Sequence, residues 1–151
     1  MERAKITAII ESIINNVEKR IPEYMKDPAD RNISEGNVAI CIIDKQGRIY
    51  GKLFGNDKNR SRGFYNVAWK KASQVWITGY ATGKFEELVY SKKISCEQFG
   101  LSKPDLIGWE GGQPVKINEE VELAIGFSGF RGHHDLEIVS KAVDEVLKNE
   151  I

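Results

Sequence analysis

Residues 121–128, with the sequence VELAIGFS, carry the clearest fold signal in this chain. Large apolar residues alternate with small or polar ones along this stretch, the pattern of a β-strand with one strongly apolar face. A continuous apolar run of strand length stands earlier, at residues 38–43. Each run has a second strand-like segment next to it across a turn, at 48–54 for the first and at 115–117 for the second. The sequence therefore predicts two β-hairpins.

Segments with a helical spacing of apolar residues lie before and between these hairpins in the sequence. Residues 4–19 and 64–79 each place apolar side chains three and four positions apart, which is typical of an amphipathic helix. Thr82 is suited to cap a short third helix, and Asp135 is suited to open an amphipathic last helix. The predicted order is helix, hairpin, two helices, hairpin, helix. This order favours an antiparallel sheet covered by helices, an α+β fold.

Two connections show no periodicity. Residues 23–36 follow Pro22 and are interpreted as a polar connection. Residues 91–110 form a longer one. A loop of that length is uncommon in a compact domain and is often functional.

Length and composition limit the possible classes of protein. A chain of 151 residues has the size of one domain, so we expect a single domain over residues 1–151. Lysine plus arginine and aspartate plus glutamate both number 22, which gives no support to nucleic-acid or membrane binding. The first apolar run is interrupted by Glu11 and lacks the cleavage site of a signal peptide. Cys41 and Cys96 have neither a metal-type spacing nor a disulfide framework. We therefore expect a cytoplasmic protein with free thiols.

The C-terminal third gathers most of the residues that could form a site. Gly111 and Gly112 favour a turn, because glycine accepts positive φ; alternatively, the backbone passes close to a ligand there, with Trp109 lining the pocket. Gly126 stands inside a strand, which often marks a close approach of the backbone to another group. Ser128 lacks the G-x-S-x-G elbow of a serine nucleophile, so its hydroxyl is better interpreted as a hydrogen-bonding group for a ligand.

Both histidines of the chain are adjacent, at His133 and His134, and Asp135 follows them. The carboxylate of Asp135 is well placed to accept from the first free amides of the last helix. A histidine beside a helix start can be a metal ligand, a general acid or base, or a solvated polar residue. Neighbouring histidines do not chelate one ion as readily as a pair four positions apart on a helix, so zinc is a poor interpretation.

Two cations are candidates for binding an acidic group. Lys71 lies on the apolar side of the second helix, beside Ala72. Its side chain either extends to solvent along the apolar surface or meets a carboxylate or propionate. Arg62 is the second candidate. It belongs to the short cationic cluster Arg60-Ser61-Arg62, just before this helix.

Together these motifs resemble the haem-degrading domain family. Its members include secreted haem-binding sensor proteins, the C-terminal domains of some corrinoid adenosyltransferases and small proteins encoded beside glycolate oxidase. The family pattern is a helical Lys-Ala pair, then Gly-Gly-x-Pro, then a strand ending in Ile-Gly-x-Ser-Gly, then an Asp that starts the last helix. In this chain the motifs are Lys71-Ala72, Gly111-Gly112-Gln113-Pro114, Ile125-Gly126-Phe127-Ser128-Gly129 and Asp135. The resemblance covers nearly the whole chain.

The resemblance implies a single α/β-sandwich domain with a five-stranded antiparallel, profilin-like sheet. It also implies assembly into homodimers and often into larger rings or octamers, with ligands near the subunit contacts and haem as the candidate cofactor. Haem-binding members use a histidine on the first helix. Residues 6–19 contain none, which leaves His133 or His134 as the iron ligand. Phe127 replaces a small residue of the pattern and suggests a specialised pocket.

Three hypotheses for the function follow. The first is a protein that binds haem or a related tetrapyrrole in an apolar pocket, with His133 or His134 at the iron. The second is an enzyme acting on a small anionic metabolite, with either histidine as acid or base and an anion held by polar groups. These groups are Ser128, the amides of Gly111 and Gly112, and Lys71 or Arg62. The third is an oligomeric scaffold without chemistry.

Overall fold

A computed structural model describes residues 2–150 of the chain. Its helices and strands are α1 Arg3–Tyr24, α2 Pro28–Ser34, β1 Val38–Asp44, β2 Ile49–Phe54, α3 Lys58–Thr78, α4 Thr82–Tyr90, the 3-10 turn η1 Glu97–Phe99, β3 Gly112–Lys116, β4 Glu122–Ser128 and α5 Gly132–Glu150. None of the helices within 2–150 is long and apolar enough to cross a membrane.

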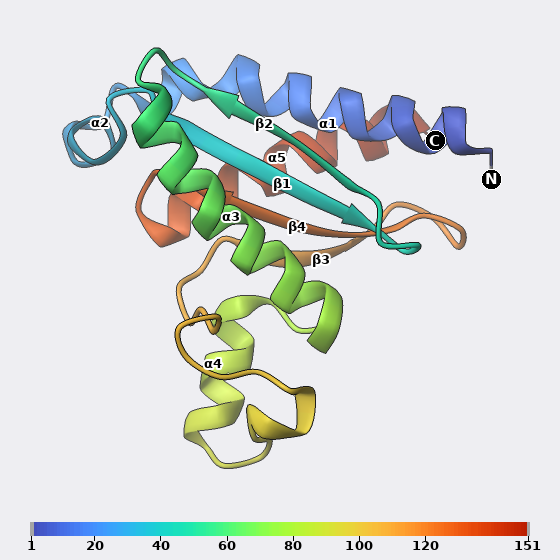
Figure 1. Cartoon of the computed structure of the whole chain (residues 1–151). Helices are drawn as coiled ribbons and strands as arrows, with labels where there is room; N and C mark the ends of the chain where they lie inside the picture. Colours follow the sequence, from blue (N-terminus) through green and yellow to red (C-terminus); the bar gives the residue numbers. More distant parts are fainter. Residues whose placement is uncertain (1, 151) are drawn as a thin grey trace.

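The strands form one antiparallel sheet in the order β2-β1-β4-β3 (Figure 1). Both predicted hairpins are confirmed, and β1 and β4 pair in the centre with Ile40 opposite Phe127. The α+β class is therefore confirmed. The five-stranded sheet implied by the family resemblance is wrong, because the sheet formed by residues 2–150 has four strands. The segment 91–110 has no apolar alternation, and it forms η1 and irregular loop instead of a further strand.

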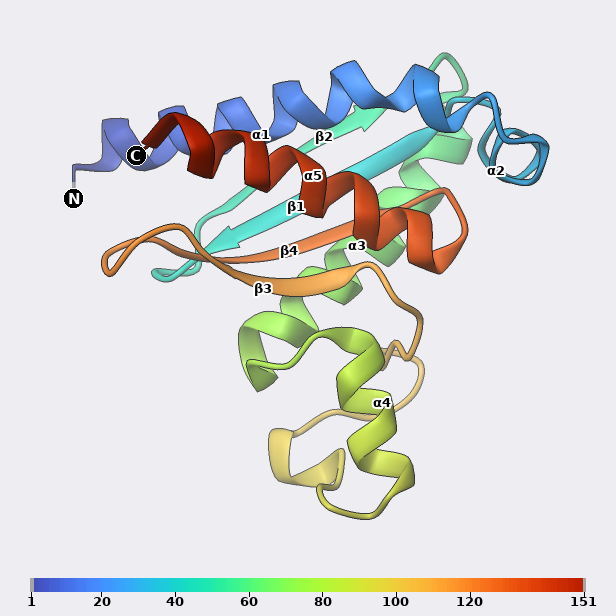
Figure 2. The same cartoon turned by 180° about the vertical axis from the view of Figure 1, so that it is seen from behind.

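Helices cover both faces of the sheet. Helices α1 and α5 lie side by side on one face (Figure 2), and α3 crosses the opposite face (Figure 1). The larger core lies between the sheet and the α1–α5 pair, where Ile10, Ile13 and Ile138 are fully buried. Burial of each such side chain contributes roughly 1.5–3 kcal/mol. The side-chain amide of Asn16 on α1 donates to the carbonyl of Ala142 on α5 at 3.2 Å and so joins the two helices.

The face of the sheet under α3 consists mainly of small residues. Cys41, Ala124 and Gly126 on the strands meet Ala68 and Ala72 on the helix. A Cβ atom added at Gly126 would lie 2.1 Å from the carbonyl oxygen of Ala68. The glycine inside the strand is thus explained by close approach of the helix backbone, as the sequence suggests.

Several boundaries differ from those predicted. Helix α1 continues past residue 19 to Tyr24, with Pro22 inside its last turn. The predicted polar connection 23–36 contains α2, which begins at Pro28 after the capping residue Asp27. The Asp27 carboxylate accepts from the amide of Ala29 at 2.9 Å, and proline is favoured at a first helical position because its missing N–H is not needed there.

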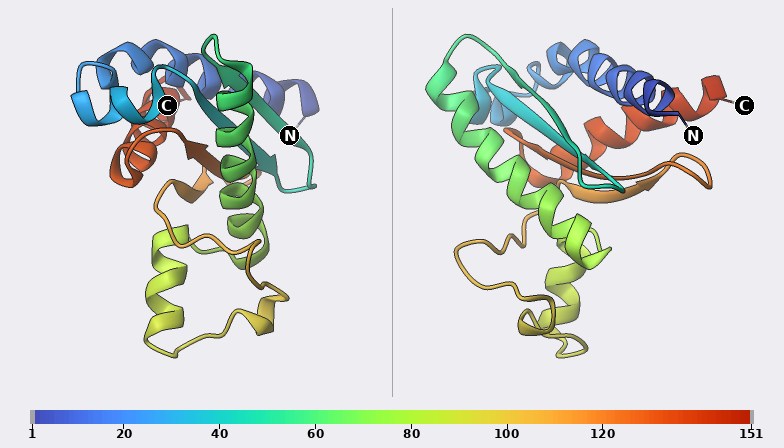
Figure 3. Two further views of the ribbon diagram at one scale, coloured as in Figure 1. Left: turned by 60° about the vertical axis from the view of Figure 1, so that its left-hand side comes forward. Right: turned by 45° about the vertical axis from the view of Figure 1, so that its right-hand side comes forward.

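Helix α4 and residues 91–110 project from the sheet as an arm (Figures 1 and 3). Thr82 is the first residue of α4 rather than its cap, which is Ala81. The Thr82 hydroxyl instead joins two backbone segments, donating to the carbonyl of Trp109 at 2.5 Å and accepting from the amide of Gly112 at 3.2 Å. This side chain fixes the base of the arm against the start of β3.

Candidate functional site

The family motifs meet at a buried ion pair between α3 and α5. The Lys71 ammonium donates to the carbonyl oxygen of Phe127 at 2.8 Å and to the Asp135 carboxylate at 3.2 Å. Lys71 is only 1% exposed and Asp135 only 3%. The second Asp135 oxygen accepts from the amide of Phe130 at 2.8 Å. Lys71 therefore meets a carboxylate of its own chain, and its side chain does not extend to solvent.

Burial dominates the titration of this pair. Desolvation raises the pKa of Asp135 to about 7, although the nearby Lys71 ammonium and the Phe130 amide oppose the rise. Desolvation likewise lowers the pKa of Lys71 below its ordinary value, against the attraction of Asp135. Each group supplies the counter-charge that the other needs in an apolar site.

The glycine pair closes over this ion pair. A Cβ atom at Gly111 would lie 2.6 Å from the Lys71 ammonium nitrogen, and the φ of 121° at Gly111 also favours glycine. A Cβ atom at Gly112 would lie 2.6 Å from the methyl group of Thr82. The amide of Gly112 already donates a hydrogen bond to the Thr82 hydroxyl. The pair therefore serves close packing, and the Gly112 amide is not available to an anion.

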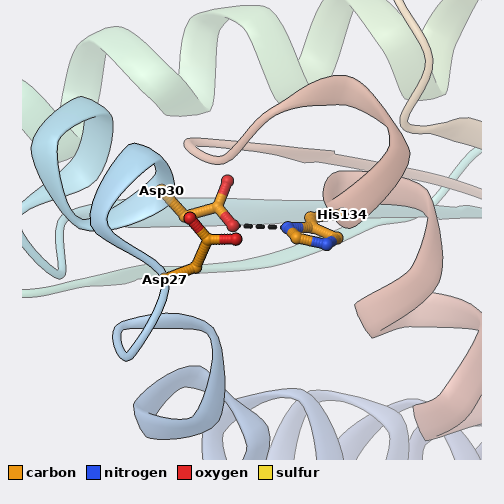
Figure 4. A group of neighbouring side chains, drawn as sticks. All are labelled: Asp27, Asp30 and His134. Atoms are coloured by element: carbon orange, nitrogen blue, oxygen red, sulfur yellow. Dashed lines mark hydrogen bonds and ion pairs between the residues drawn. The ribbon is translucent and has the colours of Figure 1, made fainter.

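A second cluster of charged groups lies at the start of α5, on the side facing α2 (Figure 4). Asp30 is fully buried and contacts both Arg131 and His134. The Arg131 backbone amide donates to Asp30 at 3.0 Å, its guanidinium donates at 3.2 Å, and the same guanidinium pairs with Asp27. Burial by itself raises the pKa of Asp30, but the hydrogen bonds from Arg131 and His134 outweigh it and hold this pKa below the ordinary value.

His134 is oriented by Asp30. The Nδ1 atom of His134 lies within hydrogen-bond distance of the Asp30 carboxylate, and Figure 4 shows the other ring nitrogen on the far side of the ring. An ionised carboxylate only accepts, so this contact favours the proton on Nδ1. The Arg131 guanidinium lies farther from the same Nδ1, at 3.4 Å. In the neutral ring, Nε2 then carries the free lone pair. Tyr24 packs edge-on against the ring, with centroids 5.2 Å apart, and holds its plane.

The remaining predicted site residues are dispersed. His133 is exposed, and its ring lies tilted beside that of His134 with 4.2 Å between centroids; within residues 2–150 its ring nitrogens have no hydrogen-bond partner. Ser128 is buried in the strand opposite Ala39. Arg62 is exposed on α3, and Trp109 is 68% exposed in the arm. Neither side chain is joined by a hydrogen bond or ion pair to the Lys71–Asp135 pair among the described residues.

A cleft of about 480 Å³ opens beside the glycine pair, between α4 and the start of α5. Glu86, Glu87 and Glu110 line it, together with Lys84 and Leu136. The excess of carboxylates makes this cleft unsuitable for an anion.

Sequence reasoning missed Asp27 and Asp30, because both lie in the segment interpreted as a polar connection. The available signal was local. Asp27 followed by Pro28 is a helix start, and an acid in the first turn of that helix is favoured there. The contact of Asp30 with His134 spans 104 residues, and no spacing in the sequence points to it.

The sequence matches the family described as "Haem degrading protein HbpS-like" over residues 19–144. No curated protein matches the sequence significantly. Protein ORFY of Klebsiella pneumoniae is similar in structure, with a TM-score of 0.68 and 20% identity, over 93% of this chain and 88% of that one.

Two further structures share the fold. The PduOC:haem complex aligns with a TM-score of 0.62 at 13% identity, covering 95% of this chain and 93% of that one. A double mutant of HbpS from Streptomyces reticuli aligns at 0.54 and 14%, covering 85% and 83%. Because the sequence match spans most of its length, this chain belongs to the HbpS-like family of haem-degrading proteins.

Proposed function

We propose that this protein binds haem or a related tetrapyrrole, with Nε2 of His134 as the ligand to iron. The observation that carries the proposal is the contact between Asp30 and Nδ1 of His134. Metal-bound histidines almost always donate their other ring N–H to a carboxylate, carbonyl or water, which fixes the tautomer and strengthens the ligand. Membership of the HbpS-like family and the haem-bound state of the PduOC structure support the choice of cofactor.

The surroundings of His134 fit this role in two respects. The rings of Tyr24 and Phe130 pack against each other, and that of Tyr24 contacts His134, which gives the site an aromatic surface. The Arg131 guanidinium is partly exposed at the same place. Its Nε and Nη2 groups already donate to Asp30 and Asp27, so within residues 2–150 its Nη1 group is the one left to donate to a propionate. A bound haem would supply iron for ligand binding or redox chemistry. The residues of this chain would hold and orient it.

The main cavities among residues 2–150 do not reach either histidine. Neither histidine lines the cleft beside the glycine pair, the hollow between α1 and α5, the hollow on the sheet or the cavity in the arm. We therefore propose that a second copy completes the pocket, so that the functional form is a homodimer or a larger homo-oligomer. The exposed His133 beside His134 would then lie at or near the contact between copies.

The enzyme hypothesis has less support. It needs Ser128 and the glycine amides to hold an oxyanion, and Lys71 or Arg62 to bind a carboxylate. Lys71 is paired with Asp135, the Gly112 amide donates to Thr82, and Arg62 is exposed on α3 with no bond to this pair among the described residues. The scaffold hypothesis differs from ours in a measurable way, because it predicts an oligomer that takes up no haem.

The test is a haemin titration of the purified, haem-free protein, followed by native mass spectrometry. We expect a saturable shift of the Soret band and a complex of defined haem-to-chain ratio whose mass is that of an oligomer. Asp30→Asn should weaken haem binding roughly 10–100-fold, since it removes the orienting carboxylate. A spectrum identical to that of free haemin at all protein concentrations would refute the proposal. An oligomer without haem would favour the scaffold.

A further inference from the structure

The arm has a defined structure and is hydrogen-bonded to α3. Gln74 of α3 is 1% exposed, and its side-chain amide exchanges two hydrogen bonds with Ile107. It donates to the Ile107 carbonyl at 2.8 Å and accepts from the Ile107 amide at 2.8 Å. This pairing imitates one rung of a β-ladder, so the irregular segment 91–110 is held in one place.

The arm encloses a cavity of about 530 Å³ between α4 and the segment 96–108. Most of its wall is apolar, formed by Phe85 and Val89 on the helix and by Leu106 and Ile107 on the loop. This volume lies within the range of small-molecule sites, about 300–1,000 Å³, which are usually apolar with a few polar groups.

Two lysines line the same cavity from different segments. Lys92 follows the end of α4, and Lys103 lies on the loop. Among residues 2–150, neither ammonium has a carboxylate within ion-pair distance. Glu86 is the one acidic residue in the described lining. The cavity therefore combines an apolar wall with two exposed lysines and one carboxylate, a net positive charge in the described lining.

Lys92 occupies a backbone position that favours glycine. Its φ is 60°, in the left-handed region. The amide of Lys92 donates to Val89 and the amide of Lys93 to Leu88, both at 3.0 Å, which is the Schellman arrangement at a helix end. The residue at this point of the motif is usually glycine, because a Cβ atom disfavours left-handed backbone. A lysine here strains the backbone and places a cation at the cavity.

We propose that the arm cavity binds a small amphipathic molecule with an apolar body and one acidic group, held by Lys92 and Lys103. This site is separate from His134, and it does not rest on the haem proposal.

The probe for the test is 8-anilinonaphthalene-1-sulfonate, which has an aromatic body and a single anionic group. We expect saturable binding with one site per chain, measured by fluorescence. Lys92→Gly and Lys103→Ser should each weaken binding roughly tenfold, the usual effect of losing one charge-assisted contact. Lys93→Ser is the matched control, because Lys93 is adjacent but outside the cavity lining, and it should bind like the original protein.

Cys96 gives a readout specific to the site. It lines the cavity, whereas Cys41 is fully buried, and burial raises the pKa of the Cys41 thiol to about 11. Alkylation by iodoacetamide should therefore occur at Cys96, and saturating probe should slow it.

Lys92→Gly also separates a binding role from a structural one. Relief of the left-handed strain should raise the thermal midpoint of the variant while its affinity falls. Unchanged affinity in both Lys92→Gly and Lys103→Ser would overturn the proposal, as would unprotected Cys96 at saturating probe.

Discussion

The ammonium of Lys71 lies 3.2 Å from the carboxylate of Asp135, and this pair joins α3 to the start of α5 inside the protein. The next residue back, His134, is turned the other way, toward Asp30. One buried pair thus fixes the helix start that carries both histidines. The residues of the family motifs therefore hold the start of α5 in place. They do not contact the ring of His134 themselves.

At pH 8, where Asp135 is ionised in the original protein, Lys71→Met should lower the free energy of unfolding by about 3–5 kcal/mol, because it leaves the buried Asp135 carboxylate without a cation. The double variant Lys71→Met with Asp135→Asn should recover most of this loss, since the amide oxygen of asparagine can still accept from Phe130. Urea denaturation of the original protein, both single variants and the double variant gives the coupling energy. Strictly additive losses would show that the pair does not act as a unit.

The stability of the ligand-free protein should depend on pH through Asp135. Its pKa is about 7 when folded, against an ordinary value of 3.8. Between these values the folded protein holds a proton that the unfolded chain has lost, so the free energy of unfolding falls as pH rises from 4 to 7. The slope from this group is at most about 1.4 kcal/mol per pH unit. Asp135→Asn should remove it in urea titrations at several pH values, and an unchanged slope would contradict the assignment.

Gly126→Ala should destabilise the protein by about 1–3 kcal/mol, because the new methyl group would push into the backbone of α3 at Ala68. Gly63→Ala is the matched control. Gly63 lies on the exposed side of the same helix, with nothing within 4 Å of an added Cβ, so alanine should stabilise α3 by roughly 0.5–1 kcal/mol. Thermal unfolding of the two variants should give shifts of opposite sign.

Gln74→Ala should loosen the arm without unfolding the sheet. The amide and carbonyl of Ile107 would lose their partners, so hydrogen exchange should accelerate around residues 104–108 while β1 and β4 stay protected. Ser73→Ala is the control, because among the described residues the Ser73 hydroxyl bonds only within its own helix, to Trp69 and Lys70. Equal exchange in the two variants would argue against Gln74 as the anchor.

The sequence predicts the strands and the long helices well because their apolar periodicity is strong. It misses α2, since seven residues are too few to show a period. It also starts α3 six residues late, at Phe64 instead of Lys58, because the first turns of this helix are polar and mainly exposed. Its start is marked only by Asp57, whose carboxylate accepts from the Arg60 amide at 3.1 Å.

Prediction of the site is less complete for a different reason. The residues Lys71, Gly111, Gly112 and Asp135 do lie close together, while their predicted role in binding a ligand stays a prediction. Their burial is a property of how α3 and α5 pack on the sheet. Asp30 meets His134 only after α2 folds against the start of α5. No local pattern in the sequence carries that information.

The central claim is that His134 is the residue that would bind haem iron. Parallel haemin titrations of His134→Ala and His133→Ala, each with and without added imidazole, test it most directly. We expect His134→Ala to lose the Soret shift and to regain it when imidazole supplies the missing ligand, while His133→Ala keeps the original spectrum. A His134→Ala variant that binds haemin with the affinity and spectrum of the original protein would contradict the claim.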